Sequence, residues 1–293
     1  MENYHYFVAH QFTTSQKADL RFAIESAFEG TGLKAYYADL DVKQGHILDK
    51  VKDMIFRMEF GIYDISNPKM PNVFIEYGIA VAAEKPRHLI CQKGTNIPVN
   101  LEGLGRIDYK NYNHLVESLK SKVVPLEVER MELRKKMEKY TESEVLKKAV
   151  KIYQAGSEEM VQQSVVEVAD NDASNKKAWY GDSSFPNRVD LIYGPYESLP
   201  FPGRYSAFFK LKIDKNSDIN EAVHIDVYSN KNPGVNSSKL IRGIHFEHPE
   251  VYQIFAIDFI YMEGTDMEYR VTKLLQERHI WIDYIAVVEQ DSI

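Results

Sequence analysis

The chain has 293 residues, 44% hydrophobic and 27% charged, a composition typical of a soluble globular protein large enough for two domains. Its formal net charge of −7 argues against a nucleic-acid binder that uses a basic surface. No apolar run approaches the ~18 residues of a membrane span, so we expect no membrane contact.

The first residues and the cysteine content bear on the cellular compartment. A strand pattern begins at Tyr4, so we expect no signal peptide. Cys91 is the only cysteine, and it stands in an apolar segment that is typical of a buried strand. We therefore expect a cytoplasmic protein, because a reducing compartment fits both features.

Residues 1–123 alternate between strand and helix patterns. Such alternation implies right-handed crossovers and a parallel sheet with helices on both faces. We predict an α/β fold with a flavodoxin-like, five-stranded parallel sheet. Its predicted strands are Tyr4–Ala9, Lys34–Ala38, Phe60–Asp64, His88–Cys91 and Arg106–Tyr109.

The pattern changes twice after residue 123. Residues 124–156 mix basic and acidic residues with scattered apolar ones, which predicts a solvent-exposed helical connector. Residues 157–293 are rich in β-branched and aromatic residues between turn clusters, which predicts an antiparallel β-sandwich. Its predicted strands are Val161–Val168, Gly203–Ile213, Ala222–Tyr228, Tyr252–Ile260, Met267–Val271 and Ile280–Val288.

Two carboxylates in the first domain are the main candidates for chemistry. Glu76 is the only charged residue in the apolar run from Asn72 to Ala83, where an unpaired carboxylate is costly to bury. Asp64 ends the strand before it. Ligands of open α/β sheets bind outside the carboxyl ends of the strands, so we expect both acids to face one crevice.

Further polar residues follow the predicted strands at the same edge. Ribose hydroxyls and amide groups need hydrogen-bonding partners, and a flat base needs an aromatic face. The predicted substrate-binding residues are His10, Gln11, Phe12, Asp41, Gly45, Ser66 and Asn72. The sequence has no glycine-rich phosphate loop and no histidine spacing typical of metal ligands, so we expect neither a cofactor nor a metal.

Cleavage at an anomeric carbon is the most economical reaction for Glu76, because a nearby carboxylate stabilises or captures the oxocarbenium-like transition state. Asp64 would hold a ribose hydroxyl or shift the pKa of Glu76, since two close acids push their pKa values apart. The residues alone leave structural roles open. Asp64 can cap a turn, and Glu76 can face solvent or pair with Lys85 or Arg87.

The stretch from Asp64 to Ala80 resembles a signature of TIR-like nucleotide-binding proteins and of nucleoside 2-deoxyribosyltransferases. In both, an acidic strand end precedes an Asn-Val-x-x-Glu-x-Gly-x-Ala helix, matched here by residues 72–80. Asp41–Ile47 resembles the loop before the second TIR helix, and Tyr6–His10 resembles the first TIR strand. The resemblance covers about residues 4–120.

The sequence departs from the TIR pattern at two places. His10, Gln11 and Phe12 stand where TIR domains usually have a serine or glycine, and Phe74 and Ile75 replace a common Trp-Cys pair. These departures leave room for a domain that binds a nucleotide without cleaving it.

The resemblance implies an NAD⁺ glycohydrolase or cyclase that acts in bacterial antiviral defence, with NAD⁺ as substrate and self-association into a homo-oligomer. Glu76 would then support the loss of nicotinamide. Asp64 and Asn72 would position the ribose, and Phe12 would stack on the base. The alternatives are a nucleoside or nucleotide N-glycosidase or deoxyribosyltransferase, and a non-catalytic sensor of a nucleotide signal.

The last domain carries a second resemblance. Tyr193–Tyr205 and Ile280–Ile285 look like segments of carbohydrate-binding-module-like β-sandwiches, which implies recognition of a glycan or protein trigger. Trp179, Tyr180 and Tyr196 are candidates for a sugar-stacking platform, with packing in the core or in loops as the favoured alternative.

Overall fold

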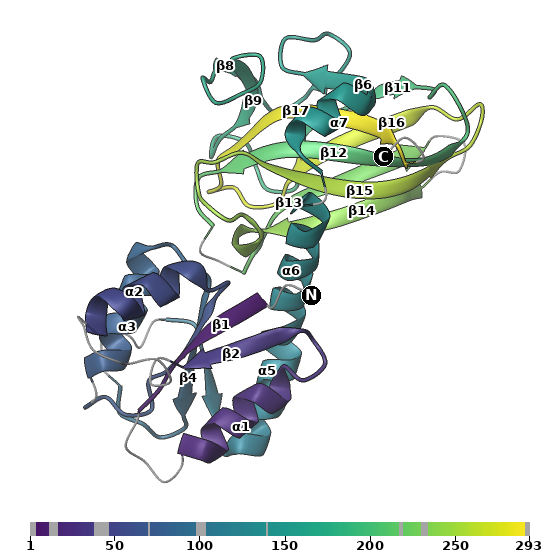
Figure 1. Ribbon diagram of the computed structural model, residues 1–293. Coiled ribbons are helices and arrows are strands. Elements are labelled where there is room, and N and C mark those ends of the chain that lie inside the picture. The colour runs from purple at the N-terminus through teal and green to yellow at the C-terminus, as the bar shows by residue number, and fades with distance from the viewer. Residues whose placement is uncertain are drawn as a thin grey trace. The chain divides into compact units, whose positions relative to one another are not determined.

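The computed structural model divides into two units, Met1–Met131 and Glu132–Ile293 (Figure 1). The structure describes residues 4–11, 17–37, 47–69, 71–97, 104–138, 140–216, 219–229 and 234–290. The boundary between the units falls inside helix α6 (Val124–Glu138), so each half of this helix contributes to a different unit.

Unit 1 contains a five-stranded parallel sheet in the order β2-β1-β3-β4-β5, which confirms the flavodoxin-like prediction. Its strands are β1 (Tyr4–Ala9), β2 (Leu33–Tyr37), β3 (Gly61–Asp64), β4 (Arg87–Gln92) and β5 (Arg106–Tyr109). Its helices are α1 (Lys17–Ala27), α2 (Ile47–Arg57), α3 (Pro71–Ala82) and α5 (Tyr112–Lys122). Figure 1 shows α1 and α5 on one face of the sheet and α2 and α3 on the other.

Strand alternation divides the core of unit 1 into two layers. Tyr6 and Ile62 pack with residues of α1 and α5 in one layer. Phe7 and Tyr63 pack with residues of α2 and α3 in the other. The Tyr63 ring lies against Gly61, where an added Cβ would overlap a ring carbon, so a larger residue at this position would force the ring to shift.

The first half of α6 is anchored within unit 1 by a buried glutamate. Glu127 is 1% exposed, and it accepts a hydrogen bond from Arg130 Nε at 2.9 Å and pairs with His88 Nε2 at 2.7 Å. Burial alone would raise the pKa of Glu127, but Arg130 and His88 hold it below its ordinary value. The predicted solvent exposure is therefore wrong at Glu127, where Arg130 and the His88 ring compensate the buried charge.

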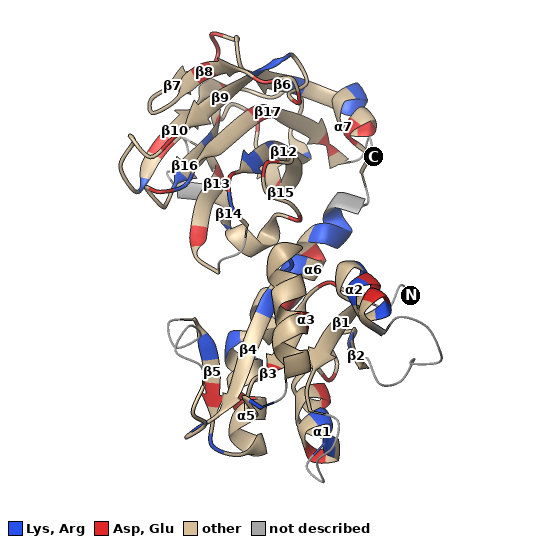
Figure 2. Ribbon diagram, turned by 90° about the vertical axis from the view of Figure 1, so that its left-hand side faces the viewer, with Lys and Arg blue, Asp and Glu red and all other residues tan. Residues whose placement is uncertain are grey.

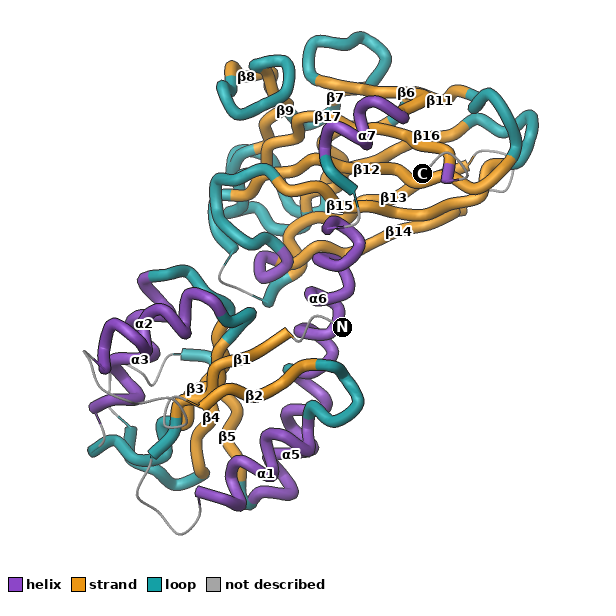
Figure 3. The backbone as a smooth tube through the Cα atoms, viewed as in Figure 1, coloured by secondary structure: helices purple, strands orange, loops and turns teal. Residues whose placement is uncertain are grey.

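Unit 2 contains two six-stranded antiparallel sheets, shown as a tube in Figure 3. One has the order β14-β13-β16-β10-β7 with β11 beside β16, and the other has the order β15-β12-β17-β9-β8 with β6 beside β17. Inward side chains of both sheets, such as Phe209 and Val223, share one core. This confirms the predicted β-sandwich.

The elements of unit 2 are α7 (Glu142–Lys148), β6 (Ala149–Gln154), β7 (Val161–Gln162), β8 (Val166–Ala169), β9 (Lys177–Gly181), β10 (Val189–Tyr193), β11 (Pro195–Glu197), β12 (Gly203–Ile213), β13 (Glu221–Ser229), β14 (Gly234–Arg242), the 3-10 helix η2 (Gly243–His245), β15 (Gln253–Tyr261), β16 (Met267–Lys273) and β17 (Ile280–Glu289). Residues 149–154, which the sequence places in the helical connector, form β6 and pair with β17. None of the described helices is long and apolar enough to cross a membrane.

Candidate functional site

Asp64 ends β3 at the carboxyl edge of the parallel sheet and is fixed there by its neighbour Ser66. The Ser66 hydroxyl donates to Asp64 Oδ1 at 2.5 Å, and the Ser66 N–H donates to the same oxygen at 3.1 Å. The backbone N–H of Gln92 in turn donates to Ser66 Oγ at 2.7 Å. Both local donors therefore use Oδ1, and no described residue donates to Oδ2.

The protonated form of Asp64 is favoured by its surroundings. Burial raises the pKa of Asp64, and the two hydrogen bonds from Ser66 only partly offset that effect. The acid thus caps the turn after its strand, as one structural alternative predicts, and it also lines a cavity.

A polar cavity of about 190 Å³ lies next to Asp64. Its described lining residues come from the ends of several strands and the helices that follow: Gln11, Lys17, Leu20, Asp64, Ser66, Asn67, Val73, Gln92, Tyr109 and Tyr112. Asn67 Nδ2 donates to Gln11 Oε1 at 2.7 Å and so joins the segments that follow β1 and β3. The rings of Tyr109 and Tyr112 are stacked, with centroids 6.2 Å apart.

Glu76 lies on the buried side of α3 with Val73 and Ala80. The residue is 7% exposed, and no described residue forms a hydrogen bond or ion pair with it. Figure 2 shows how little charge α3 carries. Burial raises the pKa of Glu76 to about 7, so at neutral pH the carboxyl group is divided between its two forms.

The alternatives for Glu76 are not supported by its contacts. A side chain that is 7% exposed does not point to solvent. Arg87 donates to the carbonyl of Lys85 at 3.0 Å, and Lys85 Nζ donates to the carbonyl of Met58 at 3.1 Å. Neither cation forms an ion pair with Glu76 in the described part of the chain.

The alternative that Asp64 shifts the pKa of Glu76 finds no support in the causes of their pKa shifts. Burial is the cause of the raised pKa of each acid, and neither carboxyl contributes to the raised pKa of the other. The charge of Asp64 instead raises the pKa of Tyr109, after burial, whereas the charge of Glu76 does the same for Tyr63. Tyr63 and Asp64 are consecutive strand residues, so their side chains point to opposite faces of the sheet.

Val73 connects the surroundings of the two acids. It lines the cavity beside Asp64 and lies on the same side of α3 as Glu76, one turn earlier. Side chains three residues apart on a helix are neighbours, with Cβ atoms about 5–6 Å apart. A ligand that leaves the cavity past Val73 would thus approach Glu76.

The predicted substrate-binding residues are placed as follows. Gln11 and Ser66 line the cavity, Asn72 is exposed on the first turn of α3, and His10 is not among the lining residues. Arg21 Nε donates to His10 Nε2 at 2.8 Å, so His10 carries its proton on Nδ1 and donates it to the Gln11 carbonyl at 2.7 Å. Phe12, Asp41 and Gly45 lie outside the described residues.

Asn67 follows the third predicted strand together with Ser66 and so belongs to the predicted edge. Six other lining residues were not predicted as site residues from the sequence: Lys17, Leu20, Val73, Gln92, Tyr109 and Tyr112. Gln92 and Tyr109 are the last residues of β4 and β5, so the rule that ligands bind at strand carboxyl ends would have found both. Within the described ranges, no group of three or more His, Cys, Asp or Glu side chains is arranged to hold a metal ion.

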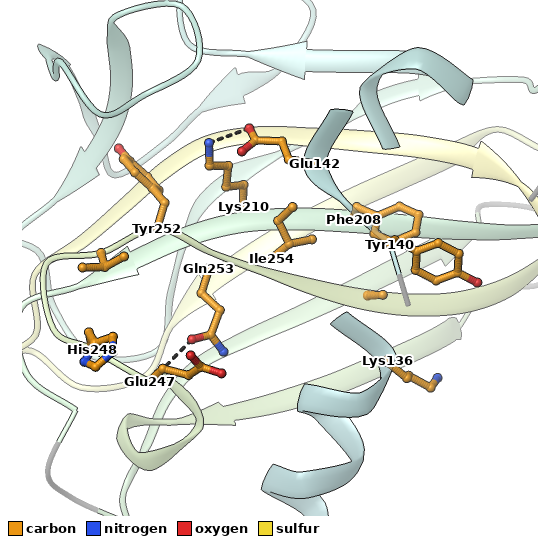
Figure 4. Close-up of a pocket in the computed structure, with 12 residues that line it drawn as sticks. Lys136, Tyr140, Glu142, Phe208, Lys210, Glu247, His248, Tyr252, Gln253 and Ile254 are labelled. Carbon is orange, nitrogen blue, oxygen red and sulfur yellow. Dashed lines mark hydrogen bonds and ion pairs between the residues drawn. The ribbon is translucent and has the colours of Figure 1, made fainter. Parts of the chain in front are cut away.

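Unit 2 has a cavity of about 240 Å³ on the outer face of β12 and β15 (Figure 4). Lys210 lies at one end, 2.6 Å from Glu142 Oε1 and 2.9 Å from Asp283 Oδ2. Burial alone would lower the pKa of Lys210, but these two carboxylates raise it above its ordinary value. Tyr140 packs edge-on against Phe208, with ring centroids 5.4 Å apart, on the right-hand side of Figure 4.

The proposed aromatic platform is not formed. Trp179 is fully buried in the core, and Tyr180 follows it on β9 and therefore points to the outer face. Tyr196 belongs to β11 in the other sheet and packs against Tyr193. Core packing, the alternative for Trp179, is confirmed.

No protein-family model matches the chain, and no curated protein matches it. Among solved structures, a family 35 carbohydrate-binding module from Clostridium thermocellum is 14% identical, with a TM-score of 0.35, over 47% of this chain and 98% of that one. A CMP N-glycosidase from Clostridium botulinum is 19% identical, with a TM-score of 0.35, over 41% of this chain and 99% of that one. Because these scores and identities are low, we base function on the residues of this chain.

Proposed function

We propose that unit 1 is an N-glycosidase that cleaves the bond between a base and the ribose of a nucleotide. The observation that carries this proposal is Glu76, a buried carboxyl group without a counter-charge among the described residues, one helical turn from the cavity wall. A purely structural acid in such a place would lower stability with no compensating contact. NAD⁺ is the first substrate to test because of the TIR-like resemblance, with antiviral defence as the proposed setting.

In the proposed reaction, the C1′–N bond breaks and its electron pair leaves with the base. The ionised form of Glu76 stabilises the oxocarbenium-like centre at C1′ or bonds to it. Water then attacks C1′, displaces Glu76 if it is bonded there, and leaves its hydroxyl group on the product. The remaining proton of water goes to the solvent when neutral nicotinamide leaves, and to the base when anionic cytosine leaves. The low polarity around Glu76 strengthens this electrostatic effect, because few dipoles compete with the developing positive charge.

The test measures the release of base from NAD⁺ and, separately, from CMP by the full chain at high protein concentration. Glu76→Gln keeps the shape of the side chain but removes its negative charge, so we expect a loss of at least about a hundredfold in rate. Glu29→Gln, at an exposed glutamate beyond α1, is the matched control and should retain wild-type activity. Equal rates in the wild type and Glu76→Gln, or no cleavage of either substrate by the wild type, would overturn the proposal.

We further propose that the cavity of unit 2 binds a neutral glycan. Its charges are already paired within the protein: Lys210 with Glu142, Lys136 with Asp258 and Glu247 with Arg134. An ionic ligand would meet no uncompensated charge among these described residues, whereas sugar hydroxyls can donate to and accept from such pairs.

Apolar side chains in the same cavity suit the C–H face of a sugar. Phe208, Ile254 and Ala256 form part of the lining, and the ring of Tyr252 forms another part. Screening the full chain against an array of neutral glycans tests the proposal. Tyr252→Ala should abolish the binding of any glycan found in this screen. If no neutral glycan on the array binds, the proposal is contradicted.

A further inference from the structure

The cavity beside Asp64 has the size and chemistry of a site for one flat, polar ring. Its volume of about 190 Å³ is smaller than the roughly 300–1,000 Å³ of pockets that enclose drug-sized ligands. A complete dinucleotide therefore does not fit inside, but a single base does. Amide side chains of Gln11, Asn67 and Gln92 supply donors and acceptors around the lining.

The hydrogen bonds of Asp64 determine what its carboxyl group offers to a ligand. Because both donors from Ser66 use Oδ1, a proton on this carboxyl group belongs on Oδ2. The protonated acid then presents its Oδ2–H as a donor to an acceptor atom of the ligand, because Oδ1 already accepts two hydrogen bonds from Ser66. The raised pKa of Asp64 supports this protonated form.

Tyr109 and Tyr112 give the cavity an aromatic wall. The Tyr109 hydroxyl lies 3.3 Å from Ser66 Oγ, which ties this wall to the same network that fixes Asp64. Tyr112 is half-buried, lines the cavity and stacks on Tyr109, so a base that enters the cavity would meet this aromatic wall. Stacking on aromatic side chains is a common and sequence-tolerant way to hold bases.

We propose that this cavity is the subsite for the leaving base, in which Asp64 donates a hydrogen bond to the acceptor of an amide-type edge and Tyr112 and Gln92 set specificity. The ligand class is a single heterocycle with adjacent hydrogen-bond donor and acceptor groups, a chemistry that nicotinamide and cytosine share. This inference rests on the proposed N-glycosidase function. The base would lie beside Asp64, and the glycosidic bond would pass Val73 toward Glu76.

Binding of free bases to the full-length Glu76→Gln protein tests the subsite without turnover. Nicotinamide and cytosine are titrated separately by calorimetry, with pyridine as the control for nicotinamide because it lacks the carboxamide edge. We expect at least one of the two bases to bind, and pyridine to bind at least about tenfold more weakly than nicotinamide if nicotinamide is the ligand. The failure of both bases to bind, or equal binding of pyridine and nicotinamide, overturns the proposal.

Variants of the wall test the assigned residues. Tyr112→Leu should weaken base binding about tenfold, whereas Tyr36→Leu, at a partly buried tyrosine packed in the other layer of unit 1, should not. Gln92→Ala removes a solvent-exposed amide but keeps the N–H that holds Ser66, so it tests specificity without disturbing the fold. Circular dichroism verifies that each variant is folded.

These experiments distinguish a failure of the proposed base subsite from a failure of the proposed N-glycosidase function. Base binding that Tyr112→Leu weakens, without cleavage of any substrate by the wild type, supports the subsite and contradicts the N-glycosidase. Cleavage that requires Glu76, with unchanged KM and unchanged inhibition by the free base in both Tyr112→Leu and Gln92→Ala, supports the enzyme and overturns the subsite.

Discussion

Replacing Glu76 with glutamine should make unit 1 more stable at neutral and alkaline pH. Burial raises the pKa of Glu76 from 4.5 to about 7, and a difference of one in pKa between folded and unfolded states is worth about 1.4 kcal/mol. Below about pH 4.5 both states hold the proton, so the raised pKa has no effect on stability. Between about pH 4.5 and pH 7 the unfolded state has lost this proton while the folded state still holds it, so the wild type loses up to about 3 kcal/mol relative to the glutamine variant, and the loss is constant above about pH 7.

Urea unfolding of the full-length wild type and Glu76→Gln at a series of pH values between about 5 and 8.5 measures this difference. Far-UV circular dichroism follows the helices of unit 1, whereas both tryptophans, Trp179 and Trp281, lie in unit 2 and report on it by fluorescence. The stability gain of Glu76→Gln should grow from about pH 5 to about pH 7 and then stay constant. A gain that does not change with pH, or a variant less stable than the wild type at the highest pH, would refute the burial argument.

Glu127→Gln is the matched control because it changes the other described buried glutamate of unit 1. This substitution removes the fully buried carboxylate that pairs with Arg130 at 2.9 Å and leaves that cation only the longer ion pair with Glu59 at 3.9 Å, so it should lower the stability of unit 1 by about 3 kcal/mol. If Glu76→Gln raises the free energy of unfolding and Glu127→Gln lowers it, then the presence of a counter-charge, rather than burial alone, decides whether a buried glutamate stabilises the fold. A stabilising Glu127→Gln would contradict this reasoning.

Three further predictions follow from the contacts described above. The rate of base release should increase about tenfold from about pH 6 to about pH 8, because the ionised fraction of a group with a pKa of about 7 grows by that factor, and a rate that falls over this range contradicts the role of Glu76. Gly61→Ala should lower the stability of unit 1 by about 1–3 kcal/mol in chemical unfolding, since the new methyl group would collide with the Tyr63 ring; no change would mean that the ring relocates freely. Lys210→Met should lower the stability of unit 2 by about 3 kcal/mol, because Asp283 is fully buried and loses its cation. Chemical unfolding followed by tryptophan fluorescence measures this loss, and wild-type stability of the variant would contradict the prediction.

Much of the secondary structure follows from local sequence patterns. The bounds of β1, β5 and β12 agree with those predicted, since alternation and turn residues are properties of short segments. β14 was not predicted, because Gly234–Arg242 contains few β-branched or aromatic residues and is stabilised by pairing with β13. Residues 149–154 likewise form a strand because β17 supplies their hydrogen-bond partners.

The candidate site was predictable in part. The rule for strand carboxyl ends brings Gln11, Asp64 and Ser66 to one cavity, as the structure has them. The same rule also applies to Tyr109, which ends β5. From the sequence alone, however, a tyrosine at the end of an edge strand is typical of an ordinary core residue. The structural role of His10 depends on Arg21, a residue eleven positions away on α1, which no local pattern reveals.

Local pattern in the sequence is enough to show that an acid ends the third strand and that a second acid stands inside an apolar helix. The contacts of the two acids depend on the folded chain: Ser66 holds Asp64 beside a polar cavity, whereas Glu76 is buried without a partner among the described residues. Burial, and not the other acid, raises the pKa of each. Burial and electrostatic interaction are set by the groups that surround a side chain in space, and many of these groups come from distant parts of the chain.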